Sequence, residues 1–367
     1  MSELANISKE YVTVTKRKKI LRRIAVVILC VILLTPTVIL PAVSAIVYHF
    51  NFSQRYETAE WMAFSADDFP GLSVTECRFP SDRGQMLAGY EYRKGDGEPK
   101  GILILAHGLG GGGQASYVNV IDYFAGCGYL VFAYDATGND KSEGSCVGGF
   151  PQGVIDLDHA IRHVKARLKE DLPIVLYGHS WGGYSACAVL EYHPDVRGVV
   201  SVAGCNDSTV MIREQGRLMA GDIIDLLIPY VTLYEKLRFG SYADASALKG
   251  FEESDARIMI LHSDDDTTVL PAYGYDIYKQ HYGNNDRFTF LRFKDRGHSY
   301  LCTSPASAQY RAELNEKYKA YVSENGLFYS EETKLTFMNE HLDKKKCFEL
   351  DAQLMEQLKN FYDTCFE

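Results

Sequence analysis

The stretch "VLYGHSWGGYSA" (residues 175–186) contains a sharp change of secondary structure around a single serine. Its apolar start is typical of a buried strand, and the residues after Ser180 are typical of a helix. Gly178 and Gly182 stand on either side of Ser180. A strand that turns directly into a helix brings two backbones close together, so both positions require a very small residue. The stretch therefore predicts that Ser180 projects from the end of a strand. Because this pattern is common by chance, its meaning depends on the rest of the chain.

The surrounding chain alternates strand and helix patterns from about residue 72. A predicted hairpin (72–94) is followed by short apolar runs separated by helical patterns. This alternation predicts an α/β fold, with a mostly parallel sheet and helices on both faces. Functional groups in such sheets gather at the carboxyl ends of the strands. The predicted parallel strands lie at residues 101–109, 129–136, 173–178, 196–204, 257–263 and 287–295.

Residues suited to nucleophilic catalysis follow the ends of three of these strands. Ser180 comes after the third parallel strand, Asp264 to Asp266 come after the fifth, and His298 comes after the last. A serine hydroxyl is a weak nucleophile unless a histidine takes its proton and an acid orients that histidine. The chain order of serine, acid and histidine is the one that accompanies a sharp strand-to-helix turn. The sequence therefore predicts a catalytic triad at one edge of the sheet.

These motifs resemble the α/β-hydrolase superfamily, and more closely its serine-hydrolase branch of monoacylglycerol lipases, esterases and serine aminopeptidase-like proteins. The resemblance implies an α/β-hydrolase fold in which Ser180 is the nucleophile, His298 the general base and Asp266 the acid. It covers roughly residues 72–302 and a final helix. The motifs that carry it are "LAHGLGG", "YDATGNDKSEG", "YGHSWGG", "ILHSDDDTTVLP" and "DRGHSYL".

Two backbone amides are predicted to form an oxyanion hole. The amide of Trp181 begins the helix after the serine, and helix N-termini favour negative charge. The second donor is predicted at Leu109, in the loop after the first parallel strand. The chain departs from the family pattern at 137–142, where "TGNDKS" stands in place of the frequent Arg-Gly-x-Gly-x-Ser, and at Ser263, where the family usually has glycine.

There are alternatives to this assignment: a non-catalytic role for Ser180, and two other histidines as the base. Ser180 taken alone could be an inert helix cap. His107 precedes the predicted oxyanion loop, and His179 is next to the serine but is expected to point elsewhere. Only His298 follows the last strand, so the sequence favours it as the base.

The acid has more alternatives than the base. Asp264 is the alternative to Asp266, and Asp265 is interpreted as a solvated neighbour. Asp135 ends its strand and is interpreted as structural, which makes it a weaker alternative acid. Three consecutive acids also suggest a metal, but no His or Glu set completes the ligands that a hard cation needs. We therefore expect neither a metal nor a cofactor.

The N-terminal region has the composition of a membrane anchor. Residues 1–23 carry seven Lys or Arg against two Glu, and the next charged residue is Arg55. The apolar run between them is long enough to cross a bilayer, with Pro36 and Pro41 expected to kink it. We predict a cytoplasmic basic segment (1–23), a transmembrane anchor (24–48) and an extracytoplasmic domain. The alternative is a cleaved signal peptide with "AVSA" as its cleavage site.

The predicted hydrolase domain (72–367) has two insertions. The first, about 206–255, lies where this superfamily carries a lid, and its amphipathic stretch "IIDLLIPYVTLYEKL" is predicted either to line an acyl pocket or to cover core. The second, about 303–350, is polar and helical and is expected beside the rim of the site. The nine cysteines do not form a recognisable disulfide framework.

The sequence favours a membrane-anchored serine hydrolase that cleaves carboxylic esters. A net charge of −10 argues against nucleic acid as a partner. One alternative is a serine aminopeptidase-like enzyme, which would need carboxylates to hold a free amino terminus. Another is a binding protein that has kept the fold without catalysis. The substrate expected is a small ester or a short acyl or peptidyl compound, and the oligomeric state is not indicated.

Overall fold

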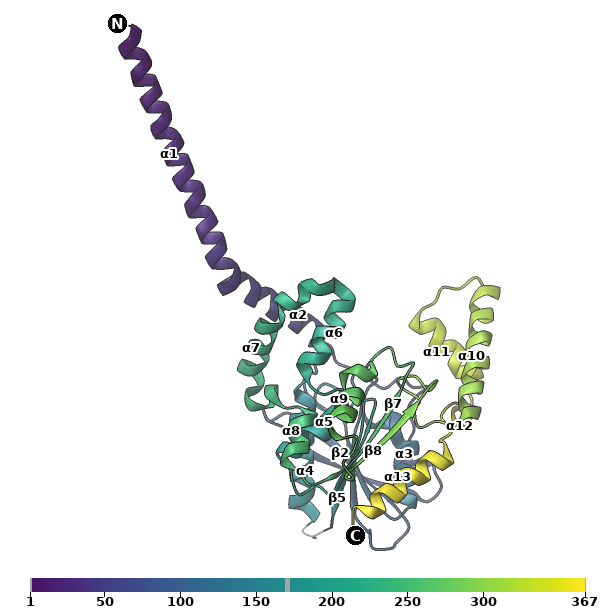
Figure 1. Ribbon diagram of the computed structural model, residues 1–367. Coiled ribbons are helices and arrows are strands. Elements are labelled where there is room, and N and C mark those ends of the chain that lie inside the picture. The colour runs from purple at the N-terminus through teal and green to yellow at the C-terminus, as the bar shows by residue number, and fades with distance from the viewer. Residues whose placement is uncertain (1, 169–171, 367) are drawn as a thin grey trace.

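The computed structural model describes residues 2–168 and 172–366, and in that part of the chain eight strands form one sheet (Figure 1). Their order is β1-β2-β4-β3-β5-β6-β7-β8. The β1–β2 hairpin is antiparallel, β2 pairs antiparallel with β4, and the remaining pairs are parallel, as predicted. The strands are β1 (Leu72–Pro80), β2 (Met86–Lys94), β3 (Ile102–Ala106), β4 (Leu130–Tyr134), β5 (Ile174–His179), β6 (Gly198–Val202), β7 (Arg257–Ser263) and β8 (Phe288–Phe293).

The central strands are buried on both faces because helices cover both sides of the sheet. Every residue of β3, β4 and β6 is buried. Helices α3 (Val118–Gly126) and α13 (Ala352–Thr364) cover one face, and α4 (Gln152–Leu168), α5 (Trp181–Ala188) and α8 (Ala247–Glu253) pack against the other. Helix α9 (Tyr275–Tyr282) follows β7. This two-sided burial is what continuous apolar strand runs predict.

The register of the central strands brings two loops together at the carboxyl edge. Ala106 of β3 pairs with Gly178 of β5. The chain leaves β3 toward Leu109 and leaves β5 toward Ser180, so both segments emerge side by side. This is the edge at which functional groups collect in parallel sheets.

The chain begins with a long helical run that bends near its prolines. Helix α1 (Ser2–Leu34) leads through a π-helical turn (Thr35–Ile39) into α2 (Leu40–Phe52), and Figure 1 shows the axis changing direction there. Pro36 has no amide hydrogen to continue the ladder, which accounts for the local change of winding. Residues Thr15–Phe52 are long and apolar enough to cross a membrane, with a mean hydropathy of 2.8 in the most apolar window.

Helix α2 packs against the segment between β6 and β7, which we call the β6–β7 insertion (residues 203–256). This insertion contains α6 (Ser208–Ala220), α7 (Ile228–Phe239) and α8. Ser44 and Tyr48 of α2 are buried, and the Tyr48 hydroxyl donates to Glu235 of α7 (2.6 Å). Ser208 of α6 donates to the same carboxyl oxygen (2.6 Å). A buried polar contact of this kind fixes α2 in one orientation on the insertion.

Glu235 makes this contact sensitive to pH. Burial raises the pKa of its carboxyl to about 7, although hydrogen bonds from Ser208 and Tyr48 oppose the rise. Because the folded-state pKa exceeds the ordinary value of 4.5, the group stabilises the fold below about pH 4.5 and loses that contribution as pH rises through about 7. A glutamine at this position stays neutral at every pH. In wild type the free energy of unfolding should fall by about 2 to 3 kcal/mol between about pH 4.5 and 7, and Glu235→Gln should lack this fall.

Thermal melts of the full chain in detergent at pH 4.5 and 8 measure this effect. The melting temperature of Glu235→Gln should exceed that of wild type by a margin that grows with pH. Glu252→Gln, an exposed glutamate on α8, is the matched control and should track wild type. Parallel curves for wild type and Glu235→Gln would contradict a raised pKa for Glu235.

The other segments also pack on the sheet. Residues 53–71 lie against the domain, with Tyr56 bridging to Asn139, so the packed unit begins before the predicted boundary at 72. The predicted insertion at about 303–350 contains α10 (Pro305–Glu324), α11 (Glu331–His341) and α12 (Lys344–Cys347). Figure 1 shows α10 and α11 on the opposite side of the molecule from α6 and α7. All nine cysteines are free thiols.

Candidate active site

Ser180 lies at the tight turn that the sequence predicts. Its backbone is left-handed (φ 56°, ψ −116°), a conformation that is costly for a residue with a side chain. A Cβ on Gly178 would lie 2.1 Å from the carbonyl oxygen of Gly182, and one on Gly182 would lie 2.0 Å from that of Ala106. Neither position can accept a larger residue without moving backbone. The turn therefore presents the serine hydroxyl at the end of β5.

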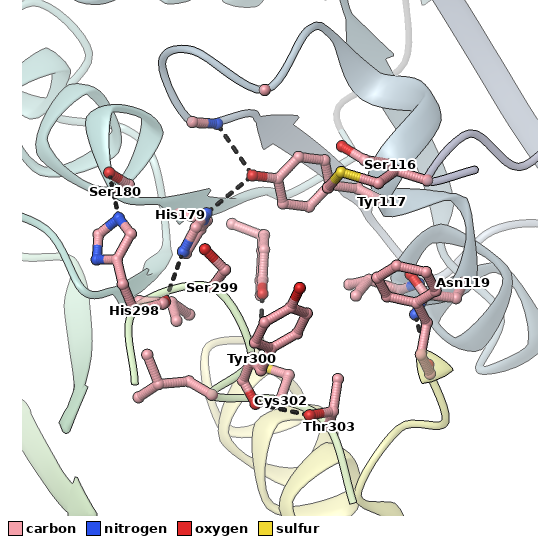
Figure 2. Close-up of a pocket in the computed structure, with 18 of the residues that line it drawn as sticks. Ser116, Tyr117, Asn119, His179, Ser180, His298, Ser299, Tyr300, Cys302 and Thr303 are labelled. Carbon is pink, nitrogen blue, oxygen red and sulfur yellow. Dashed lines mark hydrogen bonds between the residues drawn. The ribbon is translucent and has the colours of Figure 1, made fainter. Parts of the chain in front are cut away.

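The structure brings Ser180, His298 and Asp266 together in one hydrogen-bonded row. His298 Nε2 lies 2.8 Å from Ser180 Oγ, and His298 Nδ1 lies 2.7 Å from Asp266 Oδ2. Figure 2 shows the His298 ring facing the serine. The three residues come from the ends of β5, β7 and β8. This is the arrangement that a hydroxyl nucleophile, its base and an orienting acid require.

Asp266 is held rigidly as an anion. Its side chain is buried, and the amides of Thr268 and Val269 both donate to Oδ1 at 2.9 Å. Burial alone would raise the pKa of this carboxyl, but hydrogen bonds from His262 and His298 outweigh burial and hold the pKa below its ordinary value. Asp266 is thus ionised across the working pH range and can stabilise a charged His298.

The alternative acids occupy other positions. Asp264 forms an ion pair with Arg292 on the surface. Asp265 accepts from Ser263 Oγ (2.6 Å) and from the amide of Gly297 (2.9 Å), so it joins the loop after β7 to the loop that carries His298. The hydroxyl at position 263, where the related proteins usually have glycine, takes part in this link.

Asp135 is also engaged away from His298. It is buried, accepts from the Tyr90 hydroxyl (2.8 Å) and from the amide of Gln114 (3.0 Å), and its pKa is raised by burial. Its hydrogen bonds tie the end of β4 to β2 and to the start of the helical segment after β3. These contacts agree with a structural part for this aspartate.

His179 connects the two catalytic loops, a role that the sequence did not reveal. Its Nδ1 accepts from the Tyr117 hydroxyl (2.8 Å), which itself accepts from the amide of Gly108 (3.1 Å). Its Nε2 donates to the backbone carbonyl of His298 (3.0 Å). Burial and, to a smaller extent, the nearby His298 lower the pKa of His179 to about 4, so the ring is neutral at pH 7. Figure 2 shows this chain of contacts.

His107 has a different position from both other histidines. It is buried, and its Nδ1 donates to the carbonyl of Gly108 (2.8 Å) while Nε2 accepts from the amide of Ala136 (2.9 Å). It therefore joins the loops after β3 and β4. Its nitrogens are occupied by backbone groups, which leaves His298 as the histidine on the serine.

The two predicted oxyanion donors are Trp181, which directly follows the serine, and Leu109, which lines the same cavity as the serine. The amide of Trp181 is at the first position of α5, where helix geometry provides no intrahelical acceptor. Leu109 lies in the loop after β3, and within the described residues its amide has no hydrogen-bond acceptor. Both amides are thus available to a ligand atom.

A cavity of about 380 Å³ opens at the serine. Ser180, His298, His179 and Leu109 line one side of it. Polar and apolar side chains share the rest of the lining, and Figure 2 shows several of them around the cavity. The ends of the 303–350 segment line the cavity through Thr303, Phe348 and Leu350, which agrees with the expectation that this segment lies beside the rim of the site. The polar lining residues are Ser116, Tyr117, Asn119, Ser299, Tyr300 and Thr303.

No metal site is evident in the described part of the chain. Among residues 15–168 and 172–366, no group of three or more His, Cys, Asp or Glu side chains is placed to hold an ion. Asp264, Asp265 and Asp266 are adjacent in sequence but point to different partners, as their hydrogen bonds show.

Part of this chain is similar in sequence to known proteins. Residues 97–247 match the family model described as serine aminopeptidase, S33. The chain is 29% identical to human monoglyceride lipase over 147 residues, covering 39% of this chain and 47% of the relative. It is 35% identical to caffeoylshikimate esterase of Arabidopsis thaliana over 116 residues, covering 31% of this chain and 35% of the relative. The chain thus spans about half the length, or less, of the curated relatives it matches.

A solved structure shows the same fold over most of the chain. An esterase of Pyrococcus furiosus superposes with a TM-score of 0.51 and 15% sequence identity, covering 71% of this chain and 94% of the other. The chain has the α/β-hydrolase fold, and its central part is similar in sequence to the serine aminopeptidase S33 family. Its sheet, its turn at Ser180 and its order of strand-end residues are those of an α/β hydrolase.

Asp140 lies in the loop after β4. The residue has a positive φ of 34°, a region that favours glycine. Its carboxylate accepts from the amide of Thr58 (2.6 Å), the Thr58 hydroxyl (2.6 Å) and the amide of Gly113 (2.8 Å). These bonds offset the backbone strain and tie residues 53–71 to the glycine-rich loop after β3.

Proposed function

We propose that this chain is a serine hydrolase that cleaves carboxylic esters through Ser180, His298 and Asp266. The observation that carries the proposal is the continuous row of short contacts from Ser180 Oγ through the His298 ring to the buried Asp266. The row ends in a cavity large enough for a small ester. The relatives named as a monoglyceride lipase and a caffeoylshikimate esterase are consistent with ester substrates.

The reaction proceeds through an acyl-enzyme. Ser180 Oγ attacks the ester carbonyl carbon while its proton passes to His298 Nε2, and the carbonyl oxygen becomes an oxyanion held by the amides of Leu109 and Trp181. The bond to the alcohol oxygen then breaks, and His298 returns the proton to the departing alcohol. Water attacks the acyl-enzyme, giving one proton to His298. Release of the carboxylic acid restores the serine hydroxyl with that proton. Asp266 keeps the histidine ring in the required tautomer and stabilises its charged form.

The lining of the cavity favours an ester over a peptide with a free amino terminus. An aminopeptidase needs a negatively charged group to hold the substrate ammonium. Among the described residues that line the cavity at Ser180, none is Asp or Glu. Hydroxyl, amide and aromatic side chains are among its lining residues instead, which suits an uncharged alcohol carrying hydroxyl groups.

The helical run at the N-terminus supports a membrane-anchored enzyme. The candidate span ends in α2, which packs against the β6–β7 insertion, with Ser44 and Tyr48 buried. A segment removed as a signal peptide would take the Ser44 contact with it. The excess of Lys and Arg before the span places the N-terminus in the cytoplasm and the hydrolase domain outside it.

Hydrolysis of matched ester and amide substrates tests the proposal. The full chain in detergent is expected to hydrolyse p-nitrophenyl acetate and butyrate, and to leave aminoacyl p-nitroanilides uncut. Hydrolysis of the anilides without hydrolysis of the esters would show that the chain is a peptidase and not an esterase. A folded chain that turned over neither kind of substrate would contradict the proposal and favour a binding protein of this fold.

A further inference from the structure

A second cavity lies between the N-terminal helix and the β6–β7 insertion. It also measures about 380 Å³, and its lining is mainly apolar. Helix α2 supplies one wall through Ser44, Val47, Tyr48, Asn51 and Phe52. Helices α6 and α7 and the turn between them supply the facing wall, and Figure 1 shows these elements rising beside α2. The facing wall includes Met211, Ile212, Ile224, Leu227 and Val231.

This cavity adjoins the catalytic serine. Leu109, whose amide is a candidate oxyanion donor, lines both cavities. Phe150 lines the second cavity, and its carbonyl accepts from the indole of Trp181 (2.7 Å), the residue after the nucleophile. An ester carbonyl bound at Ser180 therefore lies in the first cavity, and the second cavity, which is the more apolar of the two, meets the first at Leu109.

Hydrogen bonds and ring contacts hold α2, which forms this wall, against the rest of the protein. Tyr48 donates to the buried Glu235 and accepts from the amide of Phe150 (3.2 Å), so it bridges the insertion and the core next to the serine. Ser44 donates to the carbonyl of Leu227 (3.4 Å). The Tyr48 ring also packs on Phe52 and Tyr234, with ring centroids 4.7 and 5.2 Å away.

The surface around this cavity is apolar, and it continues into the candidate span. On α2, Ile46 and Phe50 are 68% and 75% exposed. On the insertion, Leu218, Met219 and Ile223 are 70%, 80% and 65% exposed. Exposed aliphatic side chains gathered beside a spanning helix are suited to the boundary of a lipid bilayer. The occupant that fits both the cavity and its surroundings is an aliphatic chain.

We propose that α2, the end of the membrane anchor, is part of the substrate site: it forms one wall of the acyl-binding cavity, and Val47 is one of the residues of that wall. This inference rests on the proposed ester hydrolase function and names its substrate class as an ester of an aliphatic acid, taken from the bilayer. The anchor thus selects the substrate in addition to holding the enzyme at the membrane.

Chain-length profiles of anchor variants test this inference. The full chain in phosphatidylcholine vesicles is assayed with p-nitrophenyl esters of two to twelve carbons. In wild type, kcat/KM should rise about fourfold per added methylene until the cavity is filled, because each buried methylene contributes binding free energy. Val47→Trp narrows the cavity and should move the optimum to shorter acids, lowering kcat/KM for the longest ester at least tenfold more than kcat/KM for the acetate.

The matched control is Ile46→Trp, on the neighbouring position of α2. Ile46 lines neither cavity, so the same large side chain should leave the profile unchanged. Met211→Trp narrows the facing wall and should shorten the optimum in the same way, even if Val47→Trp lowers the amount of folded protein. Two results would overturn the inference while leaving ester hydrolysis intact. In one, Val47→Trp lowers kcat/KM equally for every chain length; in the other, the variants of residues 46 and 47 have identical profiles. Loss of acetate hydrolysis in wild type would instead remove the proposed function, and the inference with it.

Discussion

Replacing Ser180 with alanine is expected to lower kcat for ester hydrolysis about 10⁵-fold or more. The hydroxyl that forms the acyl-enzyme is lost, while the oxyanion donors and both cavities remain. Because the side chain is only partly buried at the turn and its side-chain hydrogen bond is to His298, the free energy of unfolding should change by about 0.5 kcal/mol or less. Steady-state kinetics with p-nitrophenyl butyrate and a thermal melt measure the two quantities on the same preparation.

Ser185→Ala is a useful control for this substitution. Ser185 is buried on α5, five residues along the same helix, and donates to the carbonyl of Trp181 (2.8 Å). It contacts no atom of the proposed triad, so its rate should stay within a few-fold of wild type. If Ser180→Ala kept a rate within tenfold of wild type, another nucleophile would have to perform the reaction.

Replacing Asp266 with asparagine should lower kcat about 10⁴-fold. The amide keeps the shape of the side chain but loses the charge that stabilises protonated His298, and its NH₂ group favours the wrong histidine tautomer. KM for the butyrate ester should change little, because Asp266 is buried behind His298 and contacts no substrate. Stability should fall as well, since the amides of Thr268 and Val269 now meet a weaker acceptor.

The neighbouring acids provide matched controls for the identity of the acid. Asp264→Asn removes a surface ion pair with Arg292 and should leave kcat within about twofold. Asp265→Asn weakens the link to Gly297 in the loop that carries His298. We expect its loss of kcat to lie between those of Asp264→Asn and Asp266→Asn. If Asp264→Asn lowered kcat as much as Asp266→Asn, the assignment of Asp266 as the acid of the triad would be contradicted.

Local sequence patterns predicted the features that depend on neighbouring residues. The glycines around Ser180 predicted the sharp turn because backbone contacts of 2.0 to 2.1 Å leave no space for a Cβ. Short apolar runs predicted the parallel strands because both faces of the sheet are covered. The parallel arrangement then predicted that Ser180, Asp266 and His298 would meet at one edge, although 118 residues separate the serine from the histidine.

Contacts between distant segments left no comparable signal. The link from Tyr117 to His179 joins residues 62 positions apart, and nothing in either neighbourhood indicates the other. Helix α2 is apolar on all sides, so its sequence did not show that Ser44 and Tyr48 form its buried face. The amphipathic stretch of the first insertion was predicted to line an acyl pocket or to cover core. In the structure Leu227 and Val231 line the second cavity, whereas Leu233 and Leu237 are exposed.

Covalent labelling of the serine tests the central claim most directly. The full chain in detergent is treated with a fluorophosphonate, whose phosphorus reacts with an activated serine and expels fluoride, and the adduct is located by peptide mass spectrometry. We expect one adduct, on Ser180, that forms slowly or not at all in His298→Ala and is absent in Ser180→Ala. A folded wild-type chain that remained unlabelled, or that was labelled equally well in His298→Ala, would contradict a serine activated by His298.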